Sequence, residues 1–291
     1  MLSSVISVPL HISASLLLLH PFSQFSWLKW SIHPSTVIGL AALGALYLWR
    51  ARAASDTQPL SGARKLSFFA GLFVIFAALN GPIHDLSDNY LFSGHMVQHL
   101  MLTMAMPPLL FAGVPGWMLR PLLSNRMIGG IARKVTRPVT CFAIFNLVIA
   151  LWHLPVFYNA AMDNHSIHIA EHLMFMAAAV LMWWPLLSQL PELPRLAYPG
   201  QMLYSFLMTI PMTVIAVYIT MADSVLYPHY SSAPRIMPLS PMEDQLLGGL
   251  IMWIPGGMIF MIIMSVVFFK WSTRGEDNAA AAQVDWKPTA A

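Results

Sequence analysis

The chain has 291 residues, of which 57% are hydrophobic and 9% are charged, whereas soluble globular proteins carry about 25% charged residues. This composition excludes a soluble enzyme. The formal net charge of +3 gives no reason to expect nucleic-acid binding, because basic residues in a membrane protein first report its orientation. The single cysteine, Cys141, excludes an internal disulfide and a paired-cysteine metal or redox site.

Seven apolar stretches approach the roughly 20 residues that cross a bilayer, at Ser35–Trp49, Leu66–Ile83, Tyr90–Phe111, Pro138–Leu154, Ile167–Leu187, Pro199–Ala222 and Asp244–Lys270. The sequence therefore predicts an all-α polytopic membrane protein, a bundle of about seven transmembrane helices in one domain, residues 35–270. Residues 1–34 are expected to form an outer interfacial segment, and residues 271–291 a disordered cytoplasmic tail. If the apolar run Ile12–Leu19 crosses the bilayer instead, the count becomes eight and the N-terminus moves inside.

The basic residues divide unequally between the two sides of this bundle. All of the 15 Lys and Arg residues except Lys29 and Arg235 follow the first, third, fifth or seventh span, and therefore lie on one side. Cytoplasmic loops carry the excess of basic residues. The N-terminus is thus expected outside and the C-terminus in the cytoplasm.

The histidines lie on the opposite side from the basic residues. Each of the 11 falls in a loop or helix half that this topology places toward the outside: His11, His20, His33, His84, His95, His99, His153, His165, His168, His172 and His229. A general preference of polar residues for interfaces would populate both faces. The one-sided distribution therefore indicates metal or proton chemistry that faces the outside.

Two HxxxH motifs sharpen this interpretation, namely His95 with His99 and His168 with His172. Residues at this spacing lie on the same face of a helix, so two such pairs at similar depth can converge on one metal ion, such as copper or zinc. His153 lies at the same level. Glu171 is expected either to join the site or to orient a histidine.

Weaker candidates surround these motifs. His84 stands beside Asp85 and Asp88, which either attract a cation or form a solvated loop. Met96 is either a thioether ligand suited to Cu(I) or apolar filler of the core. Any of the histidines can instead serve only as a hydrogen-bonding residue between helices.

The last predicted helix has two notable features. Glu243 and Asp244 are expected to cap its beginning, where carboxylates are favoured by the helix dipole. The run Met252–Gly257 contains Pro255 and two glycines. It is expected to bend the helix or to let a neighbouring helix approach closely.

Four separated strings occur in a fixed order along the chain: Leu91–Leu100, Trp152–Pro155 with Tyr158, His168–His172 with Trp183–Pro185, and Asp244–Gln245 with Met252–Gly257. Together they resemble the multi-spanning CtaG family of cytochrome c oxidase assembly factors, over about residues 35–270. The resemblance implies an integral factor of the bacterial plasma (inner) membrane, not an enzyme, that matures a haem-copper oxidase by handling copper on the outer side. It does not cover the N-terminal segment.

The leading hypothesis combines the resemblance with the histidine geometry. In this hypothesis, histidines hold copper and pass it to a cytochrome c oxidase subunit. The lipid bilayer and a copper donor are further partners. The candidate ligands are His95, His99, His168, His172, His153, His84, Glu171 and Met96. A haem or quinone redox protein is disfavoured, because both histidines of one HxxxH motif cannot ligate one haem iron on opposite faces. A transporter would need polar groups that continue to the inner face, where Asn80 and Asn146 are among the few. A metal-free assembly scaffold is the remaining alternative.

Overall fold

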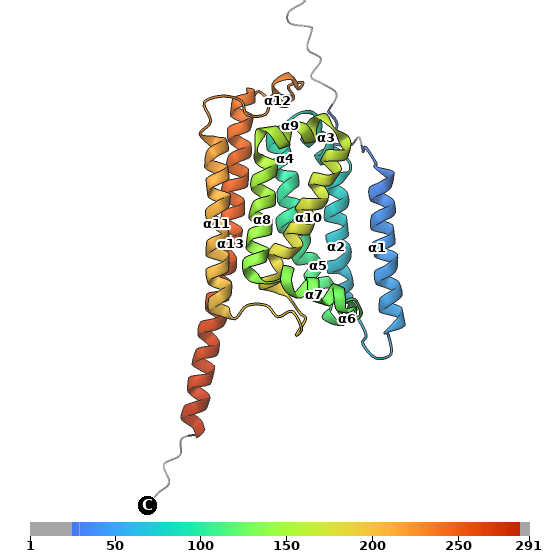
Figure 1. Cartoon of the computed structure of the whole chain (residues 1–291), viewed down its shortest axis with the longest axis vertical. Helices are drawn as coiled ribbons and strands as arrows, with labels where there is room; N and C mark the ends of the chain where they lie inside the picture. Colours follow the sequence, from blue (N-terminus) through green and yellow to red (C-terminus); the bar gives the residue numbers. More distant parts are fainter. Residues whose placement is uncertain (1–24, 29, 286–291) are drawn as a thin grey trace, which may run out of the picture.

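The computed structural model describes residues 25–28 and 30–285, and every regular element within them is helical (Figure 1). The elements are α1 (Pro34–Ala53), α2 (Gly62–Leu79), α3 (Pro82–Asn89), α4 (Phe92–Leu100), the π-helix η2 (Met101–Ala105), α5 (Met106–Gly113), α6 (Gly116–Leu123), α7 (Arg126–Val135), α8 (Pro138–His153), α9 (Pro155–Asp163), α10 (His165–Leu187), α11 (Tyr198–Thr220), α12 (His229–Ser232) and α13 (Pro241–Asp285). The predicted all-α class is confirmed.

Five helical segments of the described chain are long and apolar enough to cross a membrane: Gly62–Asn89, Phe92–Gly113, His165–Leu187, Tyr198–Thr220 and Pro241–Arg274. A sixth is added if α7 and α8, which are bent by 75° at their junction, count as one span. The structure therefore supports five or six candidate spans where the sequence predicts about seven. The helix α1 occupies the place of the first predicted span, but its last turn carries Arg50 and Arg52, which lower its hydropathy. The helix α8 has only 16 residues.

The third predicted span is not one continuous α-helix. It consists of α4, η2 and α5, with the π-helical turn just before Pro107. Proline has no N–H group, so it cannot donate to the carbonyl of Thr103 one turn earlier. The indole Nε1 of Trp183 on α10 donates to that carbonyl at 2.8 Å. A neighbouring helix thus satisfies a backbone group that the proline leaves free inside the bundle.

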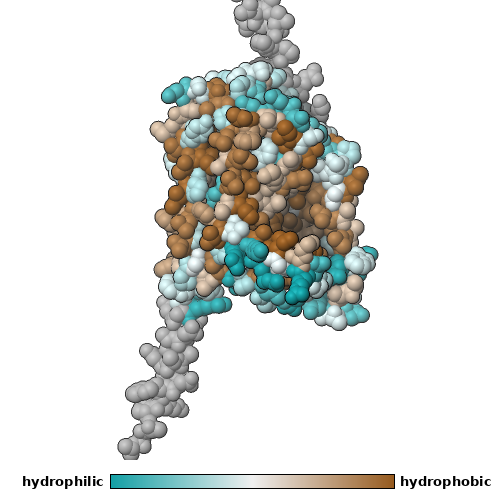
Figure 2. Space-filling model, in the orientation of Figure 1, coloured by the Kyte–Doolittle hydropathy of each residue, from teal (hydrophilic) through white to brown (hydrophobic). Residues whose placement is uncertain are grey.

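The helices pack as a bundle with α1 at its edge (Figure 1). The helix α11 lies along α13, α2 packs on α5, α10 on α8, and α4 on α13, while α1 packs mainly on α2. Buried aromatic and methionine side chains fill the interior between α4, α8, α10, α11 and α13. On the face seen in Figure 2, brown apolar residues cover the middle of the bundle and hydrophilic residues gather at its ends, as expected for a protein that lies across a bilayer.

The residues before α1 fold back on the junction between α2 and α3. Gly81 has a φ of 80°, and a Cβ at this position would lie 2.4 Å from the Trp30 ring. Its N–H donates to the Ser31 carbonyl at 3.0 Å. The side-chain oxygen of Asn80 accepts a hydrogen bond from the His33 N–H at 2.7 Å. The described part of the predicted interfacial segment is therefore held against the bundle.

The two ends of the chain complete the comparison with the sequence. The helix α13 continues past Lys270, where the sequence predicts the end of the span, through alanine-rich residues to Asp285. Alanine is the strongest helix former, which accounts for this extension. The predicted run Ile12–Leu19 and the residues His11 and His20 lie outside the described residues.

Candidate metal centre

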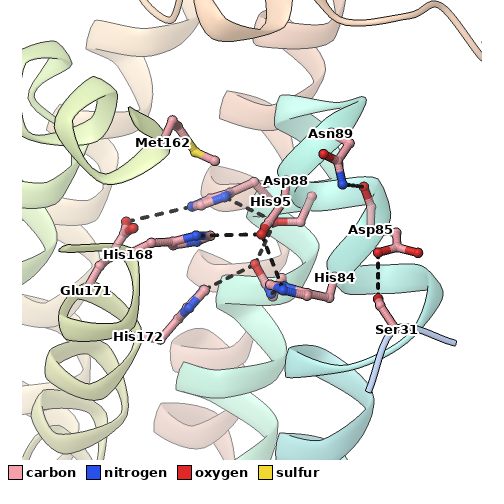
Figure 3. A network of polar contacts seen from close by, with 12 residues as sticks. Ser31, His84, Asp85, Asp88, Asn89, His95, Met162, His168, Glu171 and His172 are labelled. Atoms are coloured by element: carbon pink, nitrogen blue, oxygen red, sulfur yellow. Dashed lines mark hydrogen bonds and ion pairs between the residues drawn. The ribbon is translucent and has the colours of Figure 1, made fainter. Parts of the chain in front are cut away.

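One end of the bundle, which carries α3, α9 and α12 at the top of Figure 1, is called here the histidine end. The first two turns of α4 and α10 and the helix α3 bring together the histidine–carboxylate cluster, defined as His84, Asp88, His95, His99, His168, Glu171 and His172. Figure 3 labels all of these residues except His99. The basic loops around α6 and α7 lie at the opposite end.

The two HxxxH pairs converge. Within each pair the rings are neighbours on one helix face, with centroids 4.1 Å apart for His95 and His99 and 4.4 Å apart for His168 and His172. Between the helices, the His95 centroid lies 6.2 Å from that of His168, and the His99 centroid 6.1 Å from that of His172. All four side chains are buried. The pairs therefore face each other inside the bundle, as the spacing in the sequence requires for a shared site.

Glu171 forms the first group that could hold a metal ion. Its Oε1 lies 3.8 Å from Nε2 of His95 and 3.8 Å from Nε2 of His99. The three ligand atoms lie within 4.8 Å of one another. Glu171 is only 1% exposed and neither of its oxygens has a hydrogen-bond partner. A carboxylate in such a place needs a proton or a cation to offset the free energy of its burial.

Asp88 forms a second group with His95 and His168, in which the ligand atoms again lie within 4.8 Å of one another. Its Oδ2 is 3.6 Å from Nδ1 of His168 and 3.3 Å from Nε2 of His84. The neighbouring Asp85 accepts a hydrogen bond from the Ser31 hydroxyl at 2.6 Å instead. From the sequence, Asp85 and Asp88 are expected to behave alike in an acidic loop. In the structure, the helix α3 turns Asp88 inward. The four-residue spacing of His84 and Asp88, which puts both on one helix face, is the signal that distinguishes Asp88 from Asp85.

Gln98 organises the cluster, and sequence reasoning missed it. Its Nε2 donates to the carbonyl of Ala78 at 2.8 Å and also lies 3.2 Å from Nδ1 of His84. The amide therefore donates to His84, whose other nitrogen carries the proton that faces Asp88. The Gln98 Oε1 accepts from Nε2 of His172 at 3.3 Å. His84 and His172 are thus oriented by Gln98, and each uses a ring nitrogen in a hydrogen bond.

Ser87 orients His95 in the same way, through hydrogen bonds. Its hydroxyl donates to Gln98 Oε1 at 2.6 Å, and its oxygen lies 3.1 Å from Nδ1 of His95. Because the single hydroxyl proton is already used, Ser87 accepts from His95, so that Nδ1 of His95 is protonated and Nε2 carries a lone pair. That Nε2 is buried and has no hydrogen-bond partner. His95, which belongs to both groups, is therefore fixed in the tautomer that a metal ligand requires.

The unpartnered polar atoms of the cluster gather around the two groups. They are Asp88 Oδ1, His95 Nε2, His99 Nδ1 and Nε2, His168 Nε2, and both oxygens of Glu171. Buried polar groups without partners are destabilising. Imidazole nitrogens and carboxylate oxygens are ligands for copper, zinc and similar divalent ions, so the donor set fits a bound cation.

Four predicted ligands lie outside both groups: His84 and His172, which Gln98 holds, and His153 and Met96. His153 donates from Nδ1 to the Ile149 carbonyl at 2.8 Å, and its ring lies 5.8 Å from that of His99. Met96 is buried and lines a small cavity together with His99 and His153. Neither side chain belongs to the groups that Glu171 and Asp88 form.

The structure corrects the expectation for Asp244. It does not cap its own helix: its buried carboxylate accepts from Phe92 N–H at 2.8 Å, Ser93 N–H at 3.1 Å and the Ser93 hydroxyl at 2.5 Å, and so caps α4 across the bundle. Glu243 does cap α13, because it accepts from Ser240 N–H at 2.7 Å while the Ser240 side chain accepts from the Glu243 N–H. Asp244 therefore positions the helix that carries His95 and His99.

Three buried tyrosines cover the cluster at the histidine end. The Tyr230 hydroxyl donates to the Ser87 carbonyl at 2.8 Å and lies 2.7 Å from the Tyr158 hydroxyl, while Tyr227 donates to the His153 carbonyl at 2.9 Å. Burial raises the pKa of Tyr230 well above its ordinary value. Its hydroxyl therefore stays protonated and keeps α12 attached to α3.

This architecture defines a class: an all-helical membrane protein that buries a histidine–carboxylate cluster, with a donor set suited to a metal ion, at one end of its bundle. Residues 45–274 match the model of the family described as cytochrome c oxidase caa3 assembly factor (Caa3_CtaG), and the chain belongs to this family. The resemblance found in the four sequence strings is thereby confirmed.

Two curated mycobacterial relatives are similar to the chain. They are "Uncharacterized protein Mb0105" of Mycobacterium bovis and "Uncharacterized protein MT0111" of Mycobacterium tuberculosis, each 23% identical over 212 residues, which is 67% of this chain and 32% of the relative. The chain thus spans about a third of the length of these relatives. No solved structure matches the chain.

Proposed function

We propose that this protein binds copper in the histidine–carboxylate cluster and delivers it to a subunit of a haem-copper cytochrome c oxidase. The observation that carries the proposal is the convergence of His95, His99, Glu171, His168 and Asp88 in two groups whose ligand atoms lie within 4.8 Å of one another. Copper accepts imidazole and carboxylate ligands in several geometries. Membership of an oxidase assembly family supplies the recipient.

The shared ligand His95 gives the cluster a way to release its cargo. The inner group holds the ion with His99 and Glu171, and the outer group holds it with His168 and Asp88. An ion that keeps His95 while it exchanges the other ligands moves between the groups without leaving the protein. Glu171 is almost fully buried, whereas the side chain of Asp88 is 20% exposed. Transfer therefore runs from the buried group to the exposed one.

A cavity lined by His84 supports a place for a recipient to dock. It has a volume of about 390 Å³ between α1, α2 and α10, and its lining includes His33, His84, His165 and His172. His84 connects the cavity to the cluster, since its Nε2 lies 3.3 Å from Asp88. We infer that an oxidase subunit approaches laterally at this place and accepts copper through these histidines.

The proposed orientation puts the histidine end outside the bacterial plasma membrane. The loops at the opposite end carry the clusters of basic residues, which the positive-inside rule assigns to the cytoplasm. The N-terminus is then outside and the C-terminus cytoplasmic. A copper donor on the outer side loads the cluster, and the lipid bilayer contacts the apolar surface seen in Figure 2.

The test is the metal content of the full chain, purified without chelator and measured by mass spectrometry. We expect near-stoichiometric copper in the wild type and almost none in His95→Ala, which removes the ligand common to both groups. The matched control is Asp85→Ala, because Asp85 lies on the same helix as Asp88 but accepts a hydrogen bond from the Ser31 hydroxyl and belongs to neither group. Wild-type protein that stays free of metal after anaerobic loading with copper would reject the proposal and leave a metal-free assembly scaffold.

A further inference from the structure

A small cavity lies deeper in the bundle than the histidine–carboxylate cluster. Its volume is about 20 Å³, and its lining includes two histidines and three methionines: Met96, His99, His153, Met212 and Met252. We call this space the deep cavity. A space of this size holds about one water molecule or one ion.

Four helices supply these side chains. Met96 and His99 come from α4, His153 from the last turn of α8, Met212 from α11 and Met252 from α13. All five are buried. The neighbouring carboxylate of the cluster, Glu171, is absent from the lining. The donor atoms of the deep cavity are therefore uncharged imidazole nitrogens and thioether sulfurs.

His153 is held in the form that a metal ligand needs. Its Nδ1–H donates to the Ile149 carbonyl at 2.8 Å, so its Nε2 carries the lone pair. That Nε2 is buried and has no hydrogen-bond partner in the described chain, and the same is true of Nδ1 of His99. A hydrogen bond from the outer nitrogen to a backbone carbonyl is the usual support of a metal-binding histidine.

The backbone of α13 makes room for one of the sulfurs. A Cβ at Gly256 would lie 2.6 Å from Sδ and 2.8 Å from Cε of Met212. Gly256 thus lets the end of the Met212 side chain lie directly against the helix, which is the close approach that the sequence predicted for this glycine run. Any larger residue would displace the sulfur from its place.

We propose that the deep cavity is a second copper site, selective for Cu(I), with His153, His99 and the thioethers of Met212, Met252 and Met96 as its donors. Soft thioether sulfur favours Cu(I) over harder divalent ions. A monovalent ion also loses less hydration free energy than a divalent one when it enters an apolar interior. The proposal rests on the copper-handling function proposed above. It adds that the protein stores copper as Cu(I) in the deep cavity, further inside the bundle than the cluster.

His99 joins the two sites. Its Nε2 lies 3.8 Å from Glu171 of the cluster, and its ring lies 5.8 Å from that of His153 in the deep cavity. An ion that leaves Nδ1 of His99 in the deep cavity can therefore bind Nε2 of the same ring in the cluster, while the ring proton moves from Nε2 to Nδ1. No change of oxidation state is required for that step.

The test is copper X-ray absorption spectroscopy on the full-length protein, loaded under anaerobic conditions with the Cu(I)–acetonitrile complex. The wild type should show sulfur scatterers in the first coordination shell. The double variant Met212→Leu/Met252→Leu keeps the shape of the core. It should lose most of the sulfur scattering, because only Met96 is left, and it should bind Cu(I) roughly tenfold or more weakly in competition with a Cu(I) chelator. Met182→Leu is the matched control, because Met182 is fully buried but does not line the deep cavity.

A third variant separates this inference from the proposed function. Glu171→Gln alters the cluster and leaves the deep cavity intact, so sulfur-coordinated Cu(I) should persist in it. A wild-type spectrum with nitrogen and oxygen scatterers only would overturn the deep site while copper binding by the cluster stands. Unchanged Cu(I) affinity in the double methionine variant would overturn it as well. Loss of sulfur-coordinated copper in Met182→Leu would also contradict the assignment of ligands.

Discussion

Gln98 shows how one uncharged side chain sets the chemistry of several histidines. Its amide group contacts Ala78, His84, Ser87 and His172. Through Ser87 it also determines which nitrogen of His95 is free to bind a metal. Outer partners of this kind hold ligands in the correct tautomer and orientation. If the cluster binds copper as proposed, its affinity therefore depends on a residue that does not touch the ion.

We expect Gln98→Leu to weaken copper binding by about 10–100-fold, the usual effect of losing an outer partner. The variant has a similar volume, but it releases His84 and His172 and removes the acceptor of the Ser87 proton. The measurement is competition with a copper chelator, on protein that elutes as a single species from size-exclusion chromatography.

The control is Gln201→Leu. Gln201 is also buried and donates to a backbone carbonyl, that of Leu196 at 2.7 Å, but at the opposite end of the bundle. It should leave copper affinity unchanged. Equal affinities for the wild type and Gln98→Leu would show that the tautomers do not depend on Gln98.

The candidate site was predictable from sequence only to the extent that it depends on helical spacing. The HxxxH spacing places His95 with His99 and His168 with His172 on common faces, and the structure brings both pairs together. The choice between the nitrogens of each ring depends on Gln98 and on partners from other helices. Spacing along one helix contains no information about such contacts.

At the scale of the element, α4 is the helix on which the site depends, and its beginning is fixed from another helix. Asp244 is completely buried and accepts hydrogen bonds from Phe92 and Ser93, whose N–H groups have no partner within α4. Carboxylates at a helix N-terminus are favoured by the helix dipole. The cap of α4 is therefore also a connection between α4 and α13.

We expect Asp244→Ala to lower the free energy of unfolding by about 1–3 kcal/mol, because it leaves these buried N–H groups without an acceptor. Copper binding should weaken too, since α4 carries His95 and His99. The measurement is the thermal unfolding midpoint of the detergent-solubilised protein. Glu243→Ala is the control: its carboxylate is exposed and caps only α13, so its midpoint should fall less. Equal midpoints for both variants would contradict the role of Asp244.

The positions of the helices could be predicted where they depend on amino-acid composition. Local departures from α-helical geometry could not be predicted where they depend on contacts with other helices. The apolar stretches located the membrane helices, and proline residues begin α3, α8 and α9. The π-helical turn at Met101–Ala105 depends on the hydrogen bond from Trp183 to Thr103. A proline such as Pro107 interrupts helical hydrogen bonding wherever it stands, but the sequence does not show which distant side chain donates to the carbonyl that is left free.

At the scale of the whole molecule, charge and histidines are separated along the axis of the bundle. Basic residues surround α6 and α7 at one end, and the described histidines lie at the other. In the proposed orientation, this positive charge keeps the first end in the cytoplasm. Copper that reaches the cluster then comes from the outer side, and this orientation is the condition under which the proposed delivery functions.

The orientation can be tested with cysteine labelling in intact cells, because the only native cysteine, Cys141, is buried. Ser231 lies exposed at the histidine end, and Ser124 lies exposed in the basic loop between α6 and α7. We expect a membrane-impermeant maleimide to label Ser231→Cys in whole cells, and to label Ser124→Cys only after the membrane is opened. The unmodified protein is the control for Cys141 and should stay unlabelled in both conditions. The reverse pattern would place the cluster in the cytoplasm, where it could not receive copper from outside.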